Sequence, residues 1–549
     1  MLLVISLIAL VTYKVVRLAY YVNLAKGTAL PYTITPFLET ETASLLLLNP
    51  LLRRIYHSHL DRGEGWPRWC RFFIKDWSWE DKRRAHDELG DVFLCVSPEG
   101  IICYSAEAAM GLDVMNRRSD FTKPRDKYKI LEPYGPNVVT AEGKTYQFHL
   151  RITAPPFSDI SGVNSLVWRE TTAQTKCLID AWLQAPQGIQ RDVNSLTLAV
   201  ISLAGFGKRL DWKSTAQTED ESSFLSAISD TVRYIVLILI IPRWVLMLTP
   251  WKRAAVAQFQ LEQHLRGIIR DQRTKLAKDI NHTDAYSRGN LLTAIVRASI
   301  VLESESNGPS QPKGFNDEET MGNVFIYLLA GYETTANAII YGLIALAIHQ
   351  DIQDNVIAEI DQVYEHAKDS GSRTELTYED DFERLEYTYG FMYETLRLFP
   401  GVTLITKVAT NPQHITTNSK PYLLPAGTRV YLSAPGIHYH PKYWPDPEKL
   451  DPHRWINTDN SGKRVTAADR NRQMRGTFLG FSDGGRACLG RKFAQAEYIA
   501  FFATLLRRCR VELAPGVDAA IIKRDLYGKS GGSITLTPLG NVPLRIRAR

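Results

Sequence analysis

The chain has 549 residues, of which 45% are hydrophobic and 23% charged, with a net charge of +6. This composition allows a large buried core and excludes an intrinsically disordered chain, and the scattered Lys and Arg residues argue against nucleic acid as the main partner. The six cysteines contain no C-x-x-C pair, which argues against a zinc ribbon or a thioredoxin-type site and is typical of a reducing compartment.

An apolar segment opens the chain. Residues 2–13 carry no charge, and a helix that continues to Val22 is about 31 Å long, close to the thickness of the hydrocarbon core, if Lys14 and Arg17 reach the interface. A cleaved signal peptide is the alternative, but no basic residue precedes the apolar run and no clear cleavage site follows it. Because the basic residues follow the run, we predict a membrane anchor over residues 1–22 with the rest of the chain in the cytosol.

After this segment, two further regions differ in their sequence patterns. Residues 23–65 are expected to form a proline-punctuated linker and membrane-proximal segment, and from residue 66 short strands alternate with long helices. Asn316, followed by Glu319 at capping-box spacing, is expected to begin the longest helix. The expected elements are a hairpin over 92–104, helices within 160–205 and 251–304, an amphiphilic segment over 234–248 that Pro242 interrupts, a helix over 317–349, strands over 403–410 and 425–432, and a hairpin over 528–538.

The middle of the long helix carries the run AGYETT, which begins with Ala330 and Gly331. Small residues here leave a gap in which O2 can sit over a flat cofactor. Thr334 can bond to the helix carbonyls or to bound oxygen, and Glu333 can deliver protons through water. A polar kink in a buried helix is the alternative interpretation.

A Glu–Arg pair follows in the stretch FMYETLRLFP. Glu394 and Arg397 stand three residues apart, a spacing that is common on helix surfaces and weak by itself. The surrounding residues are apolar, which favours a buried pair, and a buried pair needs further partners. Arg454, in the segment DPHRW, can supply one.

The strongest signal is FSDGGRACLG, which matches F-x-x-G-x-R-x-C-x-G at each fixed position, with a chance frequency of about one in ten thousand chains. A Cys488 thiolate would hold haem iron and favour O–O cleavage, while Gly484 and Gly490 let backbone N–H groups approach the sulfur. Arg486 can pair with a haem propionate, and Phe481 can shield the thiolate from water. The alternative is that Cys488 is a small buried residue, as most unbridged cysteines are.

These three signals, in this order, resemble the cytochrome P450 family over residues 66–545. The resemblance implies a mainly α fold with a smaller β region, in which a triangular helical body carries a sheet at its N-terminal side, after one N-terminal transmembrane helix. It also implies a haem-thiolate catalytic domain over residues 66–549. Heme b, iron protoporphyrin IX, is expected between the long helix and the Cys488 loop.

One segment departs from the family pattern. The family usually takes a Trp and, four residues on, a basic residue from the helix that here contains GKTYQFHLR, and those places hold Tyr146 and Leu150. His149 or Arg151 is therefore expected to substitute as a propionate partner. Lys407 stands where the family often has another propionate-binding Arg.

The resemblance implies a monooxygenase of secondary metabolism that inserts one atom of O2 into a lipophilic small molecule, with electrons from NADPH–cytochrome P450 reductase. It also implies an endoplasmic reticulum location with a cytosolic catalytic domain. A haem-thiolate isomerase or dehydratase, which needs no external electrons, is the first alternative, but such relatives commonly lose the acid–alcohol pair that is present here as Glu333–Thr334. A non-enzymatic haem protein is the second, but a carrier would prefer two protein axial ligands. We expect residues 115–139, 205–250 and 402–405 to set substrate specificity.

Overall fold

The computed structural model describes residues 2–39, 41, 44, 48–184, 188–209, 219–278, 290–305, 314–456, 474–532 and 534–549. The chain divides into two compact units, and each unit draws on segments that are far apart in the sequence. Unit 1 comprises Met1–Pro124, Tyr393–Cys488 and Val517–Gly540, and unit 2 comprises Arg125–Met392, Leu489–Gly516 and Asn541–Arg549.

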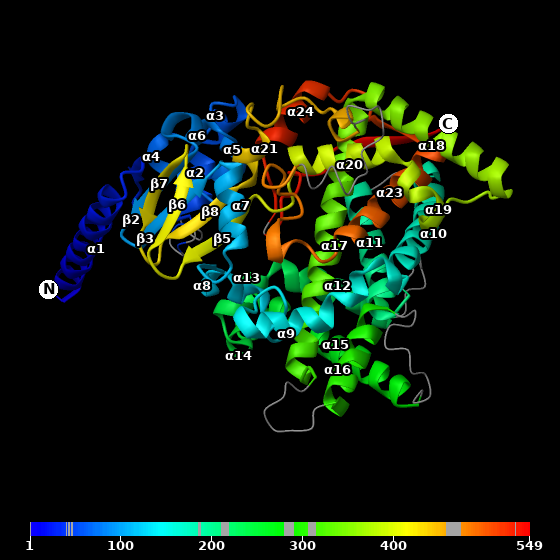
Figure 1. The fold of residues 1–549 in the computed structure, drawn as a ribbon, viewed down its shortest axis with the longest axis horizontal. Helices are drawn as coiled ribbons and strands as arrows, with labels where there is room; N and C mark the ends of the chain where they lie inside the picture. Colours follow the sequence, from blue (N-terminus) through cyan, green and yellow to red (C-terminus); the bar gives the residue numbers. More distant parts are fainter. Residues whose placement is uncertain are drawn as a thin grey trace. The chain divides into compact units, whose positions relative to one another are not determined.

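A six-stranded mixed sheet organises unit 1, in the strand order β1-β2-β3-β8-β5-β4 (Figure 1). Strands β2 and β3 pair antiparallel, with Val92 opposite Ser105, which confirms the predicted hairpin. Strand β8 pairs with β3 in parallel and with β5 antiparallel, so strands from late in the chain complete the sheet. The strands of unit 1 are β1 (Tyr32–Ile34), β2 (Val92–Ser97), β3 (Gly100–Ser105), β4 (Phe121–Thr122), β5 (Leu404–Ala409), β6 (Gln413–Thr417), β7 (Lys420–Leu424) and β8 (Arg429–Ser433).

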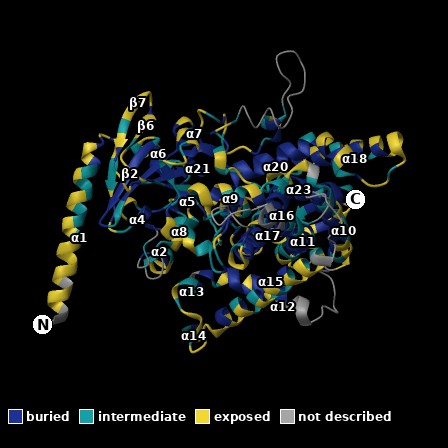
Figure 2. Ribbon diagram, turned by 60° about the horizontal axis from the view of Figure 1, so that its bottom comes forward, coloured by how far each residue is buried: buried dark blue, intermediate teal, exposed yellow. Residues whose placement is uncertain are grey.

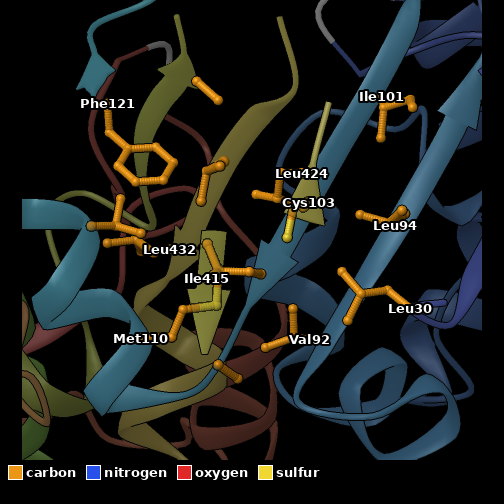
Figure 3. Close-up of a cluster of buried hydrophobic side chains, with 14 of the residues drawn as sticks. Leu30, Val92, Leu94, Ile101, Cys103, Met110, Phe121, Ile415, Leu424 and Leu432 are labelled. Atoms are coloured by element: carbon orange, nitrogen blue, oxygen red, sulfur yellow. The ribbon is translucent and has the colours of Figure 1, made fainter. Parts of the chain in front are cut away.

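Both faces of this sheet are buried, which explains why β2 is apolar at successive positions. Side chains alternate between the two faces of a strand. Val92, Leu94 and Val96 accordingly belong to one apolar cluster, while Phe93 and Cys95 belong to another. Figure 3 shows the first cluster, in which side chains from β2 and β3 gather with others from helices and from the later strands. The helices of unit 1 are α1 (Leu2–Gly27), α2 (Asn49–Ile55), α3 (His57–Asp61), α4 (Arg68–Arg71), α5 (Trp77–Asp81), α6 (Arg84–Leu89), α7 (Ala108–Asn116), α21 (Ala434–His438) and α24 (Ala519–Gly528).

Helix α1 has two different halves. Its first turns are exposed, with Ile8 59% and Val16 61% accessible, whereas its end packs onto the apolar cluster of the sheet (Figure 2). The residues of α1 in that contact are Leu18, Tyr21, Val22, Leu24 and the fully buried Ala25. Among the described residues, one helix, Val4–Gly27, is long and apolar enough to cross a membrane.

Unit 2 is almost entirely helical, and its longest helix, α17 (Asp317–Ile348), is buried over most of its length. Asn316 and Glu319 form the predicted capping box, which confirms the expected start of this helix. Pro242 separates α13 from α14, as the sequence predicts. The remaining principal elements are α8 (Arg125–Tyr128), α9 (Gly143–Thr153), α10 (Val163–Gln184), α11 (Ile189–Phe206), α12 (Glu219–Arg233), α13 (Ile235–Ile240), α14 (Arg243–Leu246), α15 (Lys252–Lys278), α16 (Leu291–Glu305), α18 (Gln350–Gly371), α19 (Tyr378–Asp381), α23 (Arg491–Arg508), β9 (Cys509–Leu513) and β10 (Leu544–Ala548), and α20 (Glu386–Leu398) continues from unit 2 into unit 1.

The predicted hairpin over residues 528–538 does not form a pair of strands. The described residues of this segment contain no strand, and within it Gly531 N–H donates to the Thr537 carbonyl at 3.0 Å, whereas other groups bond to distant parts of unit 1. Leu536 N–H donates to the Gly401 carbonyl at 2.9 Å, and the Gly532 carbonyl accepts from Lys75 Nζ at 2.8 Å. Because these bonds satisfy the polar backbone, a local ladder is not needed. The two-stranded pair near the C-terminus joins β9 to β10 instead.

Candidate active site

The loop that carries Cys488 is closed by its own backbone. Cys488 N–H donates to the Phe481 carbonyl at 2.9 Å, and Ala487 N–H donates to the Gly484 carbonyl at 3.2 Å. The turn needs left-handed backbone at Ser482, with φ of 58°, and at Gly484, with φ of 65°. Glycine adopts this conformation without steric cost, which explains why Gly484 is fixed in the sequence pattern.

Close packing against α7 gives Gly484 a second reason to lack a side chain. A Cβ at this position would lie 3.1 Å from the Met115 carbonyl oxygen and 3.0 Å from Asn116 Oδ1. Asp483 holds the turn in place, because its carboxylate accepts from Gly484 N–H at 2.6 Å and from Gly476 N–H at 3.2 Å. The conformation of the loop is therefore fixed by its packing against α7 and by the hydrogen bonds of Asp483.

The thiol of Cys488 is exposed at the surface of this loop, whereas the other cysteines of unit 1, Cys70, Cys95 and Cys103, are buried. The alternative that Cys488 is a small buried core residue is therefore excluded. A soft thiolate ligand on an open loop, with glycines that keep the backbone close, fits the ligation of haem iron. Phe481, which is partly buried, lies with its ring 5.7 Å from that of Tyr393.

The pair Glu394–Arg397 lies at the end of α20 and is completely buried, with both side chains 0% exposed. Arg397 Nη2 donates to Glu394 Oε1 at 2.7 Å, and Arg397 Nε donates to Oε2 at 2.8 Å. Arg454 Nε lies 3.3 Å from Glu394 Oε1, so the structure brings together the three residues that the sequence singles out. A surface bridge, the alternative interpretation of this motif, is excluded by the burial.

Backbone groups complete the environment of the pair. The remaining N–H groups of Arg397 donate to the carbonyl oxygens of His438 at 2.7 Å, Pro447 at 2.8 Å and Lys449 at 3.1 Å. All five donors of the guanidinium are thus used. Glu394 also accepts from the Asp451 N–H at 3.1 Å and from the indole of Trp455 at 2.9 Å. A buried ion pair is tolerated when its remaining hydrogen-bonding capacity is filled in this way.

Sequence reasoning missed three residues of this network. His438, Trp455 and the backbone of Asp451 approach the pair from segments more than 40 positions away along the chain. No periodicity signals such a contact. For Asp451 and Trp455 a signal was present, because both belong to the segment DPHRW, from which the sequence analysis took only Arg454.

In unit 2, the run AGYETT interrupts the burial of α17. Ala330 is exposed and Gly331, Glu333 and Thr334 are partly exposed, while the residues on either side of the run are buried. The helix is continuous through the run, so no kink forms here. Thr334 Oγ1 donates to the Ala330 carbonyl at 2.7 Å. A Cβ on Gly331 would lie 2.9 Å from Ile201 of α11, so this glycine also serves helix packing.

The expected propionate partners lie in contrasting surroundings. His149 is fully buried on α9, where Nδ1 lies 3.1 Å from Asn323 Nδ2 and Nε2 lies 3.6 Å from Glu319 Oε1. Burial lowers the pKa of His149 below its usual value. Arg151, two residues further along α9, is exposed. Lys407 is buried on β5 of unit 1. The ring of His149 thus joins α9 to the start of α17.

Comparison with known proteins identifies the class. The family model for cytochrome P450 matches residues 70–537. Two Penicillium proteins, cytochrome P450 monooxygenase prx9 of Penicillium rubens and cytochrome P450 monooxygenase ORF6 of Penicillium roqueforti, are each 50% identical over 99% of this chain and 96% of their own length. The crystal structure of the cytochrome P450DA heme domain shares the fold, with a TM-score of 0.66 and 21% identity over 86% of this chain and 92% of that one.

The chain therefore belongs to the cytochrome P450 family. It is a cytochrome P450 monooxygenase, an oxidoreductase with the haem-iron cofactor of that family. The match covers both units, so the Cys488 loop and the AGYETT run of α17 fall within the region that defines the class.

Proposed function

We propose that this enzyme inserts one oxygen atom of O2 into a lipophilic small molecule, reduces the other oxygen atom to water, and takes both electrons from NADPH through a separate reductase. The observation that carries the proposal is the loop from Phe481 to Cys488. Its backbone is closed by hydrogen bonds, its thiol is exposed, and the fully buried Glu394–Arg397 pair lies in the same unit.

Heme b, the proposed cofactor, supplies the site of O2 activation when it is bound. Cys488 would hold its iron as the thiolate, with Phe481 limiting the approach of water to the sulfur and Gly484 and Gly490 letting backbone N–H groups come close to it. Arg486 and Lys407 in unit 1 and Arg151 in unit 2 are the candidate cations for its carboxylates. Because His149 already contacts Asn323 and Glu319, Arg151 is the better candidate on α9.

Glu333 and Thr334 are the proposed proton-handling residues. Both residues are partly exposed in a helix that is otherwise buried, and the hydroxyl of Thr334 is the more accessible group, because Oε2 of Glu333 is itself buried. The hydroxyl of Thr334 can exchange its bond to the Ala330 carbonyl for a bond to that ligand, and the carboxyl of Glu333 can hold or release a proton. The presence of this acid–alcohol pair favours a monooxygenase over an isomerase or dehydratase.

Electrons are proposed to arrive from NADPH–cytochrome P450 reductase on the endoplasmic reticulum membrane, to which α1 would anchor the chain with its catalytic part in the cytosol. Arg475, Arg491 and Lys492 flank Cys488 in the sequence, and all three are at least partly exposed. An acidic partner would be attracted to such a segment, and salt would weaken the attraction. Arg472, a further basic residue before the loop, lies outside the described residues.

The substrate class is proposed from composition and from one relative. Of the segments expected to set specificity, 205–250 and 402–405 are rich in apolar and aromatic residues, which suits a lipophilic metabolite, whereas 115–139 is largely polar and charged. A 24% identical relative, aligned over 74% of this chain, is the phomenoic acid biosynthesis cluster cytochrome P450 monooxygenase of Leptosphaeria maculans. A role in secondary metabolism is therefore proposed here too.

The reduced protein with carbon monoxide tests the assignment of Cys488. We expect the Soret band at the wavelength that names the family, because the iron would be held by the thiolate of Cys488. Cys488→Ala should abolish this band, and Cys488→His should move it to the imidazole-type position. Cys177→Ala is the matched control, since Cys177 is the other exposed cysteine and should leave the band unchanged. A thiolate-type band that survives in Cys488→Ala would disprove the assignment.

A further inference from the structure

His438 connects the end of α20 to the loop that carries Cys488. Its side chain is 0% exposed, and both ring nitrogens are engaged. Nδ1 lies 2.8 Å from the carbonyl oxygen of Arg397, and Nε2 lies 2.8 Å from the backbone nitrogen of Leu479. The carbonyl of His438 in turn accepts from Arg397 Nη1 at 2.7 Å, so the two residues hold each other in both directions.

These partners fix the protonation state of the ring. A carbonyl oxygen can only accept, so Nδ1 must carry a proton, and a backbone N–H can only donate, so Nε2 must be bare. His438 is therefore the neutral tautomer with its proton on Nδ1. Burial and, to a smaller extent, the positive charge of Arg397 lower the pKa of His438 to about 3, which agrees with this assignment. The ring also stacks on Phe478, at 5.4 Å with an interplanar angle of 7°.

Leu479 leads directly into the cysteine loop. Its carbonyl accepts from Ser482 N–H at 3.0 Å, and the carbonyl of Phe481 accepts from Cys488 N–H at 2.9 Å. A short series of bonds therefore runs from Arg397 through the imidazole to the turn whose backbone bears Cys488. All of these residues belong to unit 1.

We infer that His438 is a positioning residue for the cysteine loop, which it holds by accepting from the Leu479 N–H at Nε2, while the bond from Nδ1 to the Arg397 carbonyl orients the ring and fixes the tautomer in which Nε2 can accept. The inference rests on the proposed role of Cys488 as haem ligand. The rival explanation is that His438 only fills the space beside Phe478, in which case the shape of the ring would matter and its nitrogens would not.

Three substitutions separate these explanations. The amide of Asn is as many bonds from Cβ as Nδ1 is, so His438→Asn keeps a donor for the Arg397 carbonyl and removes the acceptor for Leu479. The amide oxygen of Gln corresponds in the same way to Nε2, so His438→Gln keeps the acceptor for Leu479. His438→Phe keeps the aromatic ring beside Phe478 and removes both bonds. His440→Phe is the control, because His440 lies two residues away and contacts Asp91 instead of the loop.

Amide hydrogen exchange of the full-length protein is the first measurement, followed by mass spectrometry of peptides that contain Leu479. We expect exchange at this site to be about tenfold faster in His438→Asn and His438→Phe than in the wild type, because the amide loses its protein acceptor. Exchange in His438→Gln and His440→Phe should stay close to that of the wild type. This measurement does not depend on the identity of the metal ligand.

The second measurement is the rate at which the reduced carbon monoxide complex loses its thiolate-type Soret band in mild denaturant, at equal haem content. The rate should rise in His438→Asn and His438→Phe but not in His438→Gln or His440→Phe. Equal behaviour of His438→Asn and His438→Gln in both measurements, or equal loss of folded protein in these two variants, would overturn the inference. Because the test compares these two variants, it decides the question even if His438→Phe does not fold. If the wild type itself lacked the thiolate-type band, the proposed function would fail instead.

Discussion

The end of α20 and the middle of α17 both carry the polar residues of a P450 motif, but these residues are fully buried in α20 and partly exposed in α17. Glu394 and Arg397 are fully buried, and every N–H group of the guanidinium has an acceptor within unit 1. Glu333 and Thr334 are partly exposed within a helix that is otherwise buried, and Thr334 donates to the carbonyl one turn before it.

This difference separates residues that maintain the fold from residues that are available to a ligand. A buried charge with a full set of partners cannot lose one of them without leaving another unsatisfied. A partly exposed hydroxyl can change its hydrogen bond at little cost, because water or a ligand replaces the partner. Substitutions at the end of α20 should therefore remove folded protein, whereas substitutions in the middle of α17 should change its chemistry.

The largest effect is expected from breaking the buried pair. Glu394→Ala or Arg397→Ala should destabilise the protein by roughly 3–5 kcal/mol and give little or no haem-loaded protein, because the remaining charge stays buried without its partner. Haem absorbance per purified protein and chemical denaturation measure this.

Asp113→Ala is the control for this experiment. Asp113 pairs with Arg117 at 3.1 Å on α7 but is 49% exposed, so its loss should cost less than about 1 kcal/mol. Normal haem content in either α20 variant would show that the folded protein does not need both members of the buried pair, and the contrast between α20 and α17 would be wrong.

Glu497 shows the effect of burying a carboxyl group that has no hydrogen-bond partner among the described residues. It is 0% exposed on α23, yet neither carboxylate oxygen has a hydrogen-bond partner among the described residues. Burial raises the pKa of Glu497 well above its usual value. The folded protein therefore keeps a proton that the unfolded chain releases above about pH 4.3. Unfolding free energy should fall as pH rises from there, by up to about 1.4 kcal/mol per pH unit, until the folded-state pKa is passed.

Glu497→Gln should remove this dependence, because an amide does not titrate. Its stability relative to the wild type is expected to increase between about pH 5 and pH 8, measured by denaturant unfolding across a pH series. Glu394→Gln, the same substitution at the partnered carboxylate, should destabilise the protein at each pH. A Glu497→Gln variant whose difference from the wild type did not change with pH would show that the carboxyl is ionised in the fold.

Thr334→Ala should leave folding and haem content intact but reduce the fraction of NADPH that yields product by about tenfold or more, because general acid effects are typically 10² to 10⁴-fold. Peroxide should appear in place of product. NADPH consumption, peroxide and product, measured together with reductase and substrate, test this. Thr335→Ala is the control, since Thr335 is buried and should affect stability rather than coupling. Unchanged coupling in Thr334→Ala would remove this residue from the mechanism.

The smallest effect on stability is expected from shortening α1, the first helix of unit 1. Deleting residues 2–17 should move the protein toward the soluble fraction and slow turnover with reductase in liposomes, while thermal stability and haem content change little. Most of the described side chains in this part of α1 are exposed, and the ion pair from Lys14 to Glu99 is partly exposed. Deleting residues 2–27 is the contrasting variant, since it also removes Val22 and Ala25 from the apolar cluster. Equal stability of the two deletions would show that the end of α1 contributes nothing to unit 1.

Local sequence patterns predicted the structure correctly where backbone groups find their hydrogen-bond partners a few positions away along the chain. The capping box at Asn316 and the hairpin over 92–104 involve residues a few positions apart, and both predictions are confirmed. The C-terminal hairpin failed because Gly532 and Leu536 find their hydrogen-bond partners at Lys75 and Gly401, far away in the chain.

The same limit applies to the site. Cys488 and the Glu394–Arg397 pair were predicted from short motifs, and the structure places the pair and Arg454 together. His438 escaped because its two partners, Arg397 and Leu479, are each 41 positions away, in opposite directions. The propionate partners around His149 stay a prediction, since the structure shows which protein groups the ring contacts and not which cofactor groups it would bind.

The packed end of α1 leaves little flexible chain between the proposed anchor and unit 1. The side chains of Leu18, Tyr21, Val22, Leu24 and Ala25 lie against the apolar cluster of the sheet, so lipid can cover α1 no further than about Arg17. Because a continuous helix is stiff, the tilt of the anchor in the bilayer would set the orientation of unit 1 at the membrane surface. Inserting a flexible glycine–serine segment after Arg17 should release this orientation, while the haem content stays the same.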